Sequence, residues 1–192
     1  MTDADRDAAG GLDLDGFEAV VYDLDGTLVD LAVDWDAAAR DAAAALREVG
    51  VDAGGIDLWA MLDVADEAGR RDVIERVLSD HEREGARAST RLGLADDAVD
   101  RAPPKGVCSL NCEAACHLAL DAHDLARHVD AVVGRDSVAT RKPDPQPLLE
   151  TLRRLDADPA DAVFVGDSER DAVTAERAGV GFRYVPGGPS GH

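Results

Sequence analysis

The sequence predicts an α/β protein: a doubly wound, Rossmann-like parallel-sheet core with a small α-helical cap inserted after the first strand. Short apolar runs alternate with single helices over the second half of the chain, which is typical of βαβ units and a parallel sheet. One long stretch of helical periodicity separates the first apolar run from the others. The length of 192 residues is sufficient for one substantial core and a smaller second module.

The first strand is expected in FEAVVY, residues 17–22, a short run rich in apolar and β-forming residues. From Asp34 to about Ala88 the apolar residues recur at helical spacing, with breaks at GVDAGG and at Gly69. The two prolines of APP, residues 102–104, end this helical insert.

From residue 106 onward, strands and helices are expected to alternate. The expected strands are short apolar runs: GVCSL (106–110), DAVVG (130–134), AVFVGD (162–167) and GFRYV (181–185). The expected helices lie between them: NCEAACHLALDAH (111–123) with Asn111 as N-cap, PQPLLETLRRL (145–155) with prolines in its first turn, and SERDAVTAERAG (168–179) closed by Gly179. The expected division of the chain is a loose acidic tail (1–14), an α/β core (15–31 plus 102–187), a helical cap (32–101) and a second tail (188–192).

The composition excludes several classes of protein. Apolar residues make up 45% of the chain, which indicates a globular protein. No apolar stretch approaches the ~18 residues of a membrane span, and the acidic N-terminus has no signal-peptide pattern. We therefore expect a cytoplasmic protein.

The formal net charge of -20 results from 40 acidic and 20 basic residues. Such a chain is expected to repel nucleic acid and anionic membranes, because both need a basic surface. The acidic residues are spread along the whole chain, which favours adaptation to a salt-rich cytoplasm, as in halophiles. An ordinary acidic protein with a GC-rich coding bias is the alternative.

The three cysteines, Cys108, Cys112 and Cys116, lie in one short stretch. An odd number of cysteines in an intracellular chain does not describe a disulfide framework. Cys112 and Cys116 have helical spacing and His117 is a further potential ligand, but zinc sites usually need paired CxxC ligands and a fourth partner. We expect buried free thiols.

The tetrapeptide DLDG occurs twice, at residues 13–16 and 23–26. Open α/β sheets bind ligands at the carboxyl ends of their strands, and only the second copy follows a strand. The first copy precedes that strand and is predicted to be a turn. The segments that follow the expected strands carry side chains that can bind ligands or take part in catalysis: Asp23, Asp25, Thr27, Ser109, Lys142, Asp167 and Asp171.

Four motifs carry a family resemblance, and they occur in order along the chain: DLDGTL with a following Asp, a Ser at the end of a strand, KPDP, and GDSERD. Together they resemble the haloacid dehalogenase superfamily, and more narrowly its phosphoglycolate phosphatase-like branch with a helical cap. The resemblance covers the core almost end to end, whereas the cap shows only generic helical character. It implies a magnesium-dependent phosphatase that hydrolyses a small phosphomonoester, with phosphoglycolate as a candidate, through an aspartyl-phosphate.

On this resemblance, Asp23 is the expected nucleophile and Asp25 the expected general acid and base. Because two aspartates on an extended chain project to the same side, both can reach one phosphoryl group. Mg²⁺ is expected on the Asp23 carboxylate, the Asp25 carbonyl and Asp167, with Asp171 as a further metal residue acting through water or from behind the ligands.

Positive charge and hydrogen-bond donors complete the expected site. Lys142 supplies a compact charge, and it is one of only two lysines in an arginine-rich chain. Thr27, Ser109 and the Leu110 N–H are expected to bind phosphoryl oxygens. Each of these residues also has a simpler explanation as a turn, helix-terminal or surface residue, but four coincidences in order would then be required.

Two cap residues are weaker candidates. Arg70 and Arg71 follow the break at Gly69 and are expected in the first turn of a cap helix, where cations oppose the helix dipole. A guanidinium there can bind a substrate carboxylate in a bidentate contact. The alternative is that both arginines are simply solvated.

Other functions stay open at this point. A dehalogenase is disfavoured because Asp25, Asp167 and Asp171 are all present. A sugar-phosphate mutase uses the same core, and a catalytically idle binding module of the same fold is the alternative from another class. The expected partner is a small phosphorylated metabolite, with no nucleic acid and no membrane, and the chain is expected to be a monomer or a homodimer.

Overall fold

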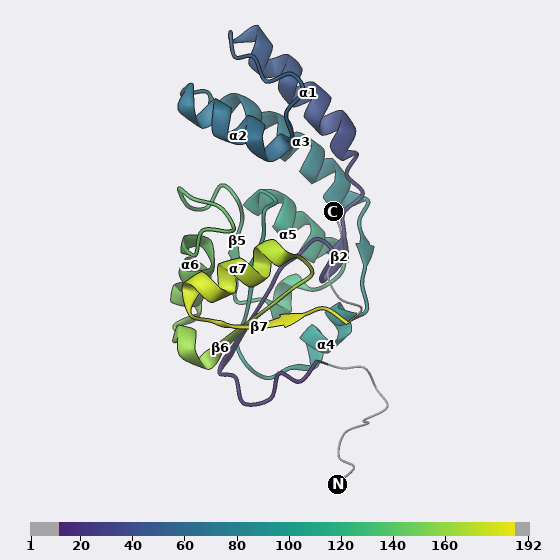
Figure 1. The fold of residues 1–192 in the computed structure, drawn as a ribbon. Helices are drawn as coiled ribbons and strands as arrows, with labels where there is room; N and C mark the ends of the chain where they lie inside the picture. Colours follow the sequence, from purple (N-terminus) through teal and green to yellow (C-terminus); the bar gives the residue numbers. More distant parts are fainter. Residues whose placement is uncertain (1–11, 187–192) are drawn as a thin grey trace, which may run out of the picture.

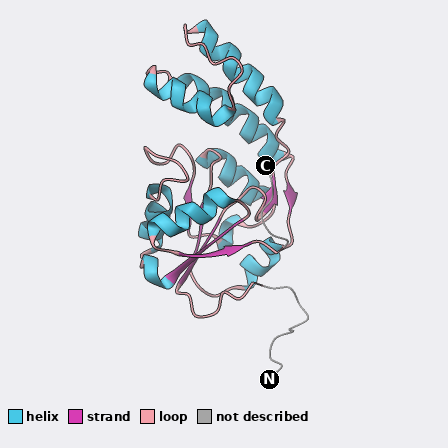
Figure 2. Cartoon of the chain, viewed as in Figure 1, coloured by secondary structure: helices cyan, strands magenta, loops and turns pink. Residues whose placement is uncertain are grey.

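The computed structural model describes residues 12–186, so most of the expected N-terminal tail and the final tail lie outside the described residues. Figure 1 shows an α/β body with three helices, α1, α2 and α3, standing off as a separate layer, and Figure 2 shows that this layer is entirely helical apart from its loops. The predicted fold class is confirmed. Within residues 12–186 no helix is both long enough and apolar enough to cross a membrane.

The core is one five-stranded sheet with the order β5-β4-β1-β6-β7. All neighbouring strands are parallel. The strands are β1 (Ala19–Tyr22), β4 (Lys105–Cys108), β5 (Ala131–Val133), β6 (Ala162–Gly166) and β7 (Gly181–Tyr184). Each expected strand is present but one or two residues shorter, because ends of the apolar runs leave the sheet to form loops, and β4 begins one residue earlier than predicted, at Lys105.

Both faces of the sheet are buried, as a parallel sheet requires. Along β1, Val20 and Tyr22 pack into one apolar cluster, whereas Ala19 and Val21 pack into another on the opposite face. The first face is covered by α5 (Glu113–Ala122). The second face is covered by α6 (Gln146–Leu155) and α7 (Glu169–Ala178). Short 3-10 turns occur at Ala126–His128 and Pro159–Asp161.

The helix ends agree with the sequence in two places and differ in one. Gly179 closes α7 in the left-handed conformation, with φ of 70°, and prolines occupy the start of α6, as predicted. The N-cap of α5 is Cys112 instead of the expected Asn111. The reason is that other side chains bind the first amides of α5: Glu82 accepts from Cys112 N and Asp136 accepts from Glu113 N.

The cap consists of α1 (Trp35–Glu48), α2 (Leu58–Glu67) and α3 (Arg71–Arg87). These helices share an apolar cluster that is separate from those of the sheet. Its buried members are Ala38, Ala42, Leu46, Ala53, Met61, Leu62, Ala65, Val73, Ile74 and Leu78. The cap therefore has its own small core, although α3 also packs extensively against α5.

Two short strands carry the chain into and out of the cap. β2 (Val29–Asp30) pairs antiparallel with β3 (Thr90–Arg91). The following α4 (Leu94–Asp100) packs against the sheet, because its Leu94, Ala95 and Ala98 belong to the same cluster as Tyr22. The sequence predicts residues 94–100 as part of the cap, but their apolar face belongs to the core.

The first DLDG copy is a turn at the amino end of β1, as predicted. Asp15 and Gly16 form the turn, and Gly16 has φ of 89°. Leu14, one residue earlier, is buried in the core. This copy therefore anchors the chain below the sheet, away from the strand ends where ligands bind.

Candidate active site

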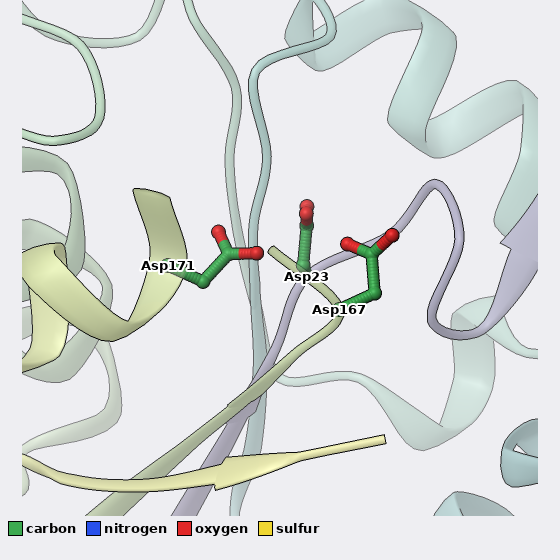
Figure 3. A group of neighbouring side chains, drawn as sticks. All are labelled: Asp23, Asp167 and Asp171. Carbon is green, nitrogen blue, oxygen red and sulfur yellow. The ribbon is translucent and has the colours of Figure 1, made fainter. Parts of the chain in front are cut away.

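Three carboxylates meet at the carboxyl ends of two central strands (Figure 3). Asp23 directly follows β1, Asp167 directly follows β6, and Asp171 lies in the first turn of α7. One oxygen from each carboxylate lies within 4.8 Å of the other two. All three side chains are buried. Because β1 and β6 are neighbours, the sheet itself sets the distance between Asp23 and Asp167.

Two glycines allow these carboxylates to sit against the backbone. A Cβ atom at Gly26 would collide with the Asp167 carboxylate, and Gly26 also has φ of 77°. A Cβ atom at Gly166 would collide with the carboxylate of Asp171. Glycine is the residue that permits both the left-handed conformation and the close approach. The glycine of the second DLDG is therefore required by the acidic cluster.

Lys142 is the cation of this cluster. Its Nζ lies 3.1 Å from Oδ2 of Asp23 and 2.5 Å from Oδ1 of Asp171. The lysine side chain is almost fully buried, and its ammonium lies 5.4 Å from the ring centroid of Phe164. The apolar and aromatic surroundings exclude water, so the two carboxylates are its counter-ions.

The protonation of the pair depends on this environment. Burial, aided by the like charge of Asp171, raises the pKa of Asp23 to about 7 against the opposing effect of Lys142. Burial lowers the pKa of Lys142, but the charges of Asp171 and Asp23 outweigh it and hold that pKa above its usual range. Lys142 therefore stays charged. A cation is needed near Asp23 to keep its carboxylate ionised, and Lys142 supplies part of that charge.

Asp171 binds several donors of the site. Its Oδ2 accepts from Ser168 N at 3.2 Å and from Ser168 Oγ at 2.5 Å, and its Oδ1 accepts from Lys142. Ser168 and Asp171 form a capping box at the start of α7. Both oxygens of Asp171 already accept hydrogen bonds, so Asp171 is placed to orient Lys142. Its predicted role at the metal would be to position the direct ligands or to bind the ion through water.

Asp25 and Thr27 lie in the turn that follows β1. The sequence pattern predicts an extended chain through Asp25, but β1 ends at Tyr22 and the chain then turns, with Leu28 N donating to Leu24 O at 2.9 Å. Oδ1 of Asp25 accepts from Leu31 N at 2.8 Å. Thr27 is buried, and among the described residues its Oγ1 has no hydrogen-bond partner. A hydroxyl in this state has the capacity to bind a ligand oxygen.

Ser109 and Leu110 follow β4, the other neighbour of β1. Ser109 is buried, and its Oγ accepts from the backbone N and from Nδ2 of Asn111, both at 3.2 Å. These two donors occupy the lone pairs of the hydroxyl and leave its proton to be donated. The Oδ1 of Asn111 is buried and, within residues 12–186, without a partner. Sequence reasoning missed this residue as a site candidate because the pattern predicts Asn111 to be a helix cap.

The donor set fits a hard divalent cation. Carboxylate and carbonyl oxygens are the ligands that Mg²⁺ takes in proteins, usually with several waters, and Asp23 and Asp167 offer them from adjacent strands. The backbone at Gly26, the residue after Asp25, lies in close contact with the Asp167 carboxylate. Asp23, Asp167 and the carbonyl of Asp25 would therefore hold the ion, with Asp171 behind them.

Helix α2 of the cap binds the core beside the cluster. Arg141, the neighbour of Lys142, forms an ion pair with Asp63 and donates to Trp59 O at 3.3 Å. Arg170, the neighbour of Asp171, lies 4.7 Å from the ring centroid of Trp59. The cap thus contacts residues adjacent to two members of the site, which places α2 near any substrate bound there.

The two cap arginines lie at the start of α3, as expected: Arg70 is its N-cap and Arg71 its first residue. Arg71 forms ion pairs with Asp66 at 3.2 Å and Glu75 at 3.3 Å, and it donates to Ala139 O at 3.3 Å. Its charge is therefore largely compensated within the protein. Arg70 donates to Gly69 O at 3.3 Å.

The cysteines are buried free thiols, as predicted. Burial is the main cause that raises the pKa of Cys108, to about 12, and it also raises that of Cys116. Both thiols therefore stay protonated at neutral pH. They pack within the apolar clusters on opposite faces of the sheet.

Comparison with known proteins agrees with this geometry. Residues 102–185 match the family described as haloacid dehalogenase-like hydrolase. A phosphoglycolate phosphatase of Mesorhizobium japonicum is 33% identical over 180 residues, covering 84% of this chain and 79% of that protein. A plasmid-encoded phosphoglycolate phosphatase of Cupriavidus necator is 34% identical over 194 residues, covering 90% of this chain and 84% of that protein.

Solved structures show the same fold. A hydrolase of this superfamily from Geobacter sulfurreducens is 26% identical, covers 86% of this chain and 88% of its own, and superposes with a TM-score of 0.58. A haloacid dehalogenase-like hydrolase of Bacteroides fragilis, at 22% identity, covers 91% and 90% with a TM-score of 0.67, which concerns the fold alone. The resemblance seen in the sequence is thus confirmed, and the chain belongs to the haloacid dehalogenase-like hydrolase family, within which it is a phosphatase.

Proposed function

We propose that the protein is a magnesium-dependent phosphatase that hydrolyses 2-phosphoglycolate through an aspartyl-phosphate. The observation that carries this proposal is the pairing of Asp23 with Lys142, 3.1 Å apart at the end of β1, with Asp167 beside them. It joins a nucleophile, a cation and a metal-binding carboxylate in one buried cluster.

In the first step, an Asp23 oxygen attacks phosphorus while the bond from phosphorus to the substrate alcohol breaks. Asp25 gives its proton to the departing alkoxide. Ser109 and Thr27 donate to phosphoryl oxygens, as does the Leu110 N–H, and the Lys142 charge compensates their negative charge. Bound Mg²⁺ would supply the remaining positive charge that permits a phosphate dianion beside several carboxylates.

In the second step, Asp25 takes a proton from water as that water attacks the phosphorus of the aspartyl-phosphate. The bond between phosphorus and the Asp23 oxygen breaks, which restores the carboxylate and releases inorganic phosphate. Lys142 stays protonated, because the charge of Asp171, joined by that of Asp23 whenever its carboxylate is free, holds the lysine pKa above its usual range.

The substrate is proposed from the relatives and from the cap. Relatives that this chain matches over 84–90% of its length carry the name phosphoglycolate phosphatase. A substrate carboxylate would be met by a cap arginine, Arg70 or Arg71. Because Arg71 already pairs with Asp66 and Glu75, the two arginines are best tested separately.

The same proposal includes the cellular location, the oligomeric state and the partners of the protein. The unpaired state of Cys108, Cys112 and Cys116 is usual in a reducing compartment, and we place the enzyme in the cytoplasm of a salt-rich cell. We propose a monomer or homodimer that acts on a small metabolite and binds neither nucleic acid nor membranes, consistent with a net charge of -20.

One assay tests the proposal. Purified protein is given a panel of phosphomonoesters with Mg²⁺ in molar KCl, and again with a chelator, with the Asp23→Asn variant as control. We expect phosphate release from phosphoglycolate that needs Mg²⁺ and Asp23. Transfer of phosphate to a sugar hydroxyl would show a mutase, and an inert wild-type protein would show an idle binding module.

Kinetics of Arg70→Ala and Arg71→Ala test the carboxylate contact. If one arginine binds the carboxylate, its removal lowers kcat/KM for phosphoglycolate more than for an uncharged phosphomonoester. Equal losses for both substrates, or none, would mean that these arginines do not recognise the carboxylate.

A further inference from the structure

Arg135 is a buried cation that the site described above does not use. It lies two residues after the end of β5, behind Gly134, and only 1% of its side chain is exposed. Its Nη1 donates to Leu110 O at 2.8 Å. The same guanidinium pairs with both oxygens of Glu82 and donates to Oε2 of Glu75 from Nε at 3.0 Å and from Nη2 at 2.8 Å.

The acceptors come from two parts of the molecule. Leu110 belongs to the loop after β4, whereas Glu75 and Glu82 belong to the cap helix α3. Glu82 is fully buried where α3 packs against α5. Arg135 therefore joins the cap to the loop that carries Ser109.

Two consecutive peptide groups of this loop are held at both ends. In the peptide that joins Leu110 to Asn111, the oxygen accepts from Arg135 and the N–H donates to Oγ of Ser109. In the next peptide, Asn111 O accepts from Arg135 N at 2.9 Å and Cys112 N donates to Glu82 at 2.8 Å. The orientation of the Ser109 hydroxyl thus depends on a peptide that Arg135 fixes.

The end of β5 leaves no room for another arrangement. A Cβ atom at Gly134 would collide with the backbone of Glu113 and would lie 2.8 Å from Asn111 O. The N–H of Ser109 donates to Val133 O at 3.0 Å. The loop is therefore packed between the end of β5 and helix α3.

A contribution to stability is a poor explanation for the buried ion pair of Arg135 with Glu82. Burial lowers the pKa of Arg135, but the charge of Glu82 and hydrogen bonds to Glu75 and Glu82 outweigh it and hold that pKa above its usual range. A buried ion pair contributes little compared with apolar residues of the same volume, because both charges lose their hydration. Its fixed, forked geometry is the property that apolar residues would lack.

We propose that Arg135 is a positioning residue that, held by Glu82 and Glu75 of the cap helix, sets the loop from Ser109 to Cys112 for phosphate binding. The proposal rests on the proposed function, since it assigns Ser109 and Leu110 to the phosphoryl oxygens. It adds that the geometry of this phosphate-binding loop depends on the position of α3.

The test variant is the double substitution Arg135→Met with Glu82→Gln. It removes both charges together, so that no buried carboxylate is left unpaired, and the amide of the Glu82→Gln side chain keeps an oxygen for Cys112 N. Arg135→Lys is the second variant, for the case that the double variant does not fold. Its single ammonium keeps the charge but cannot reproduce the forked contacts with Leu110 and both glutamates.

Arg154→Met is the matched control. Arg154 also donates to a backbone carbonyl, Val132 O at 2.7 Å, and also pairs with two glutamates, the side chains of Glu150 and Glu113, but it does not contact residues 109–112. Its loss removes an arginine with a backbone contact and two glutamate partners without touching Ser109 to Cys112.

Four measurements are made on each Mg²⁺-loaded protein: the melting temperature, the Kd for inorganic phosphate, kcat/KM for phosphoglycolate, and hydrogen exchange of the peptide that covers residues 108–113. In the folded test variants we expect phosphate affinity and kcat/KM to fall by roughly ten- to hundredfold, with faster exchange of this peptide. Arg154→Met should keep wild-type phosphate affinity, kcat/KM and exchange.

The outcomes separate this inference from the proposed function. A wild-type protein without phosphatase activity would end the proposed function, whereas exchange of residues 108–113 would still show whether Arg135 fixes the loop. A folded variant with wild-type phosphate affinity and wild-type exchange at 108–113 would overturn the positioning role. An equal loss in Arg154→Met would overturn it too, because an arginine that pairs with glutamates away from the loop would then have the same effect.

Discussion

The ammonium of Lys142 lies 3.1 Å from Oδ2 of Asp23, although 119 positions separate the two residues in the chain. The contact forms because Asp23 directly follows β1 and Lys142 precedes α6, which packs on the same sheet. Asp171 binds Lys142 from the other side. The nucleophile and its cation are thus held by three elements at once.

Lys142→Met should lower kcat by roughly a hundred- to thousandfold, since a preorganised charge at the phosphoryl group is lost. The pKa of Asp23 should rise further above about 7, because Lys142 is the main group that opposes burial and Asp171 there. Steady-state kinetics measure the first effect. Lys142→Arg, which keeps the charge but not its shape, should recover only part of the rate.

Asp171→Ala should lower the free energy of unfolding by about 2–4 kcal/mol, because it removes a capping residue and one of the two counter-ions of buried Lys142. Ser168→Ala, which removes the other half of the capping box, should cost only about 1 kcal/mol. Denaturant unfolding measures both values. Equal values for the two variants would contradict the role of Asp171 as the partner of Lys142.

Much of this site could be predicted from the sequence, because its residues lie next to short apolar runs that indicate strands. Asp23, Ser109 and Asp167 directly follow β1, β4 and β6, and apolar runs of four or five residues reveal where such strands end. Because parallel strands share one carboxyl edge, finding the strand ends also places their side chains together.

The connections between distant elements could not be predicted. Arg135 and Glu82 are 53 positions apart, and nothing in either segment indicates that a cap helix will pair with the residues that follow β5. The strands β2 and β3 have two residues each, which is too short for any periodic pattern. The expected N-cap of α5, Asn111, is wrong because the amide partners Glu82 and Asp136 come from other parts of the chain.

Alkaline pH should destabilise the protein through its buried thiols and one phenol. Burial raises the pKa of Cys108 from 9.0 to about 12 and that of Tyr22 from 10.0 to about 12. The unfolded chain therefore loses these protons first, and stability falls as pH rises from about 9 to 12, by up to about 1.4 kcal/mol per pH unit for each group.

Denaturant unfolding across this pH range measures the effect, and Cys108→Ala should reduce its slope. Folded protein at pH 8 should also react slowly with a thiol reagent, because the thiolate is the reactive form. Rapid reaction of Cys108 in the folded protein would contradict its protonated, buried state.

Salt should stabilise the protein. At a net charge of -20 the folded state repels itself, and molar salt shortens the range of that repulsion to ~3 Å. The melting temperature should therefore rise between dilute buffer and molar KCl. Sucrose at matched osmolarity controls for solvent effects other than charge, and an unchanged melting temperature in KCl would count against halophilic adaptation.

The most direct test of the central claim is to trap the phosphoryl group on the enzyme. Mg²⁺-loaded protein is mixed with phosphoglycolate labelled in its phosphate, quenched in acid within one turnover, digested, and analysed by mass spectrometry. The account predicts a labile phosphate on the peptide that contains Asp23, absent from the Asp23→Asn variant. Turnover of phosphoglycolate at a wild-type rate by Asp23→Asn, or phosphate trapped on another residue, would contradict it.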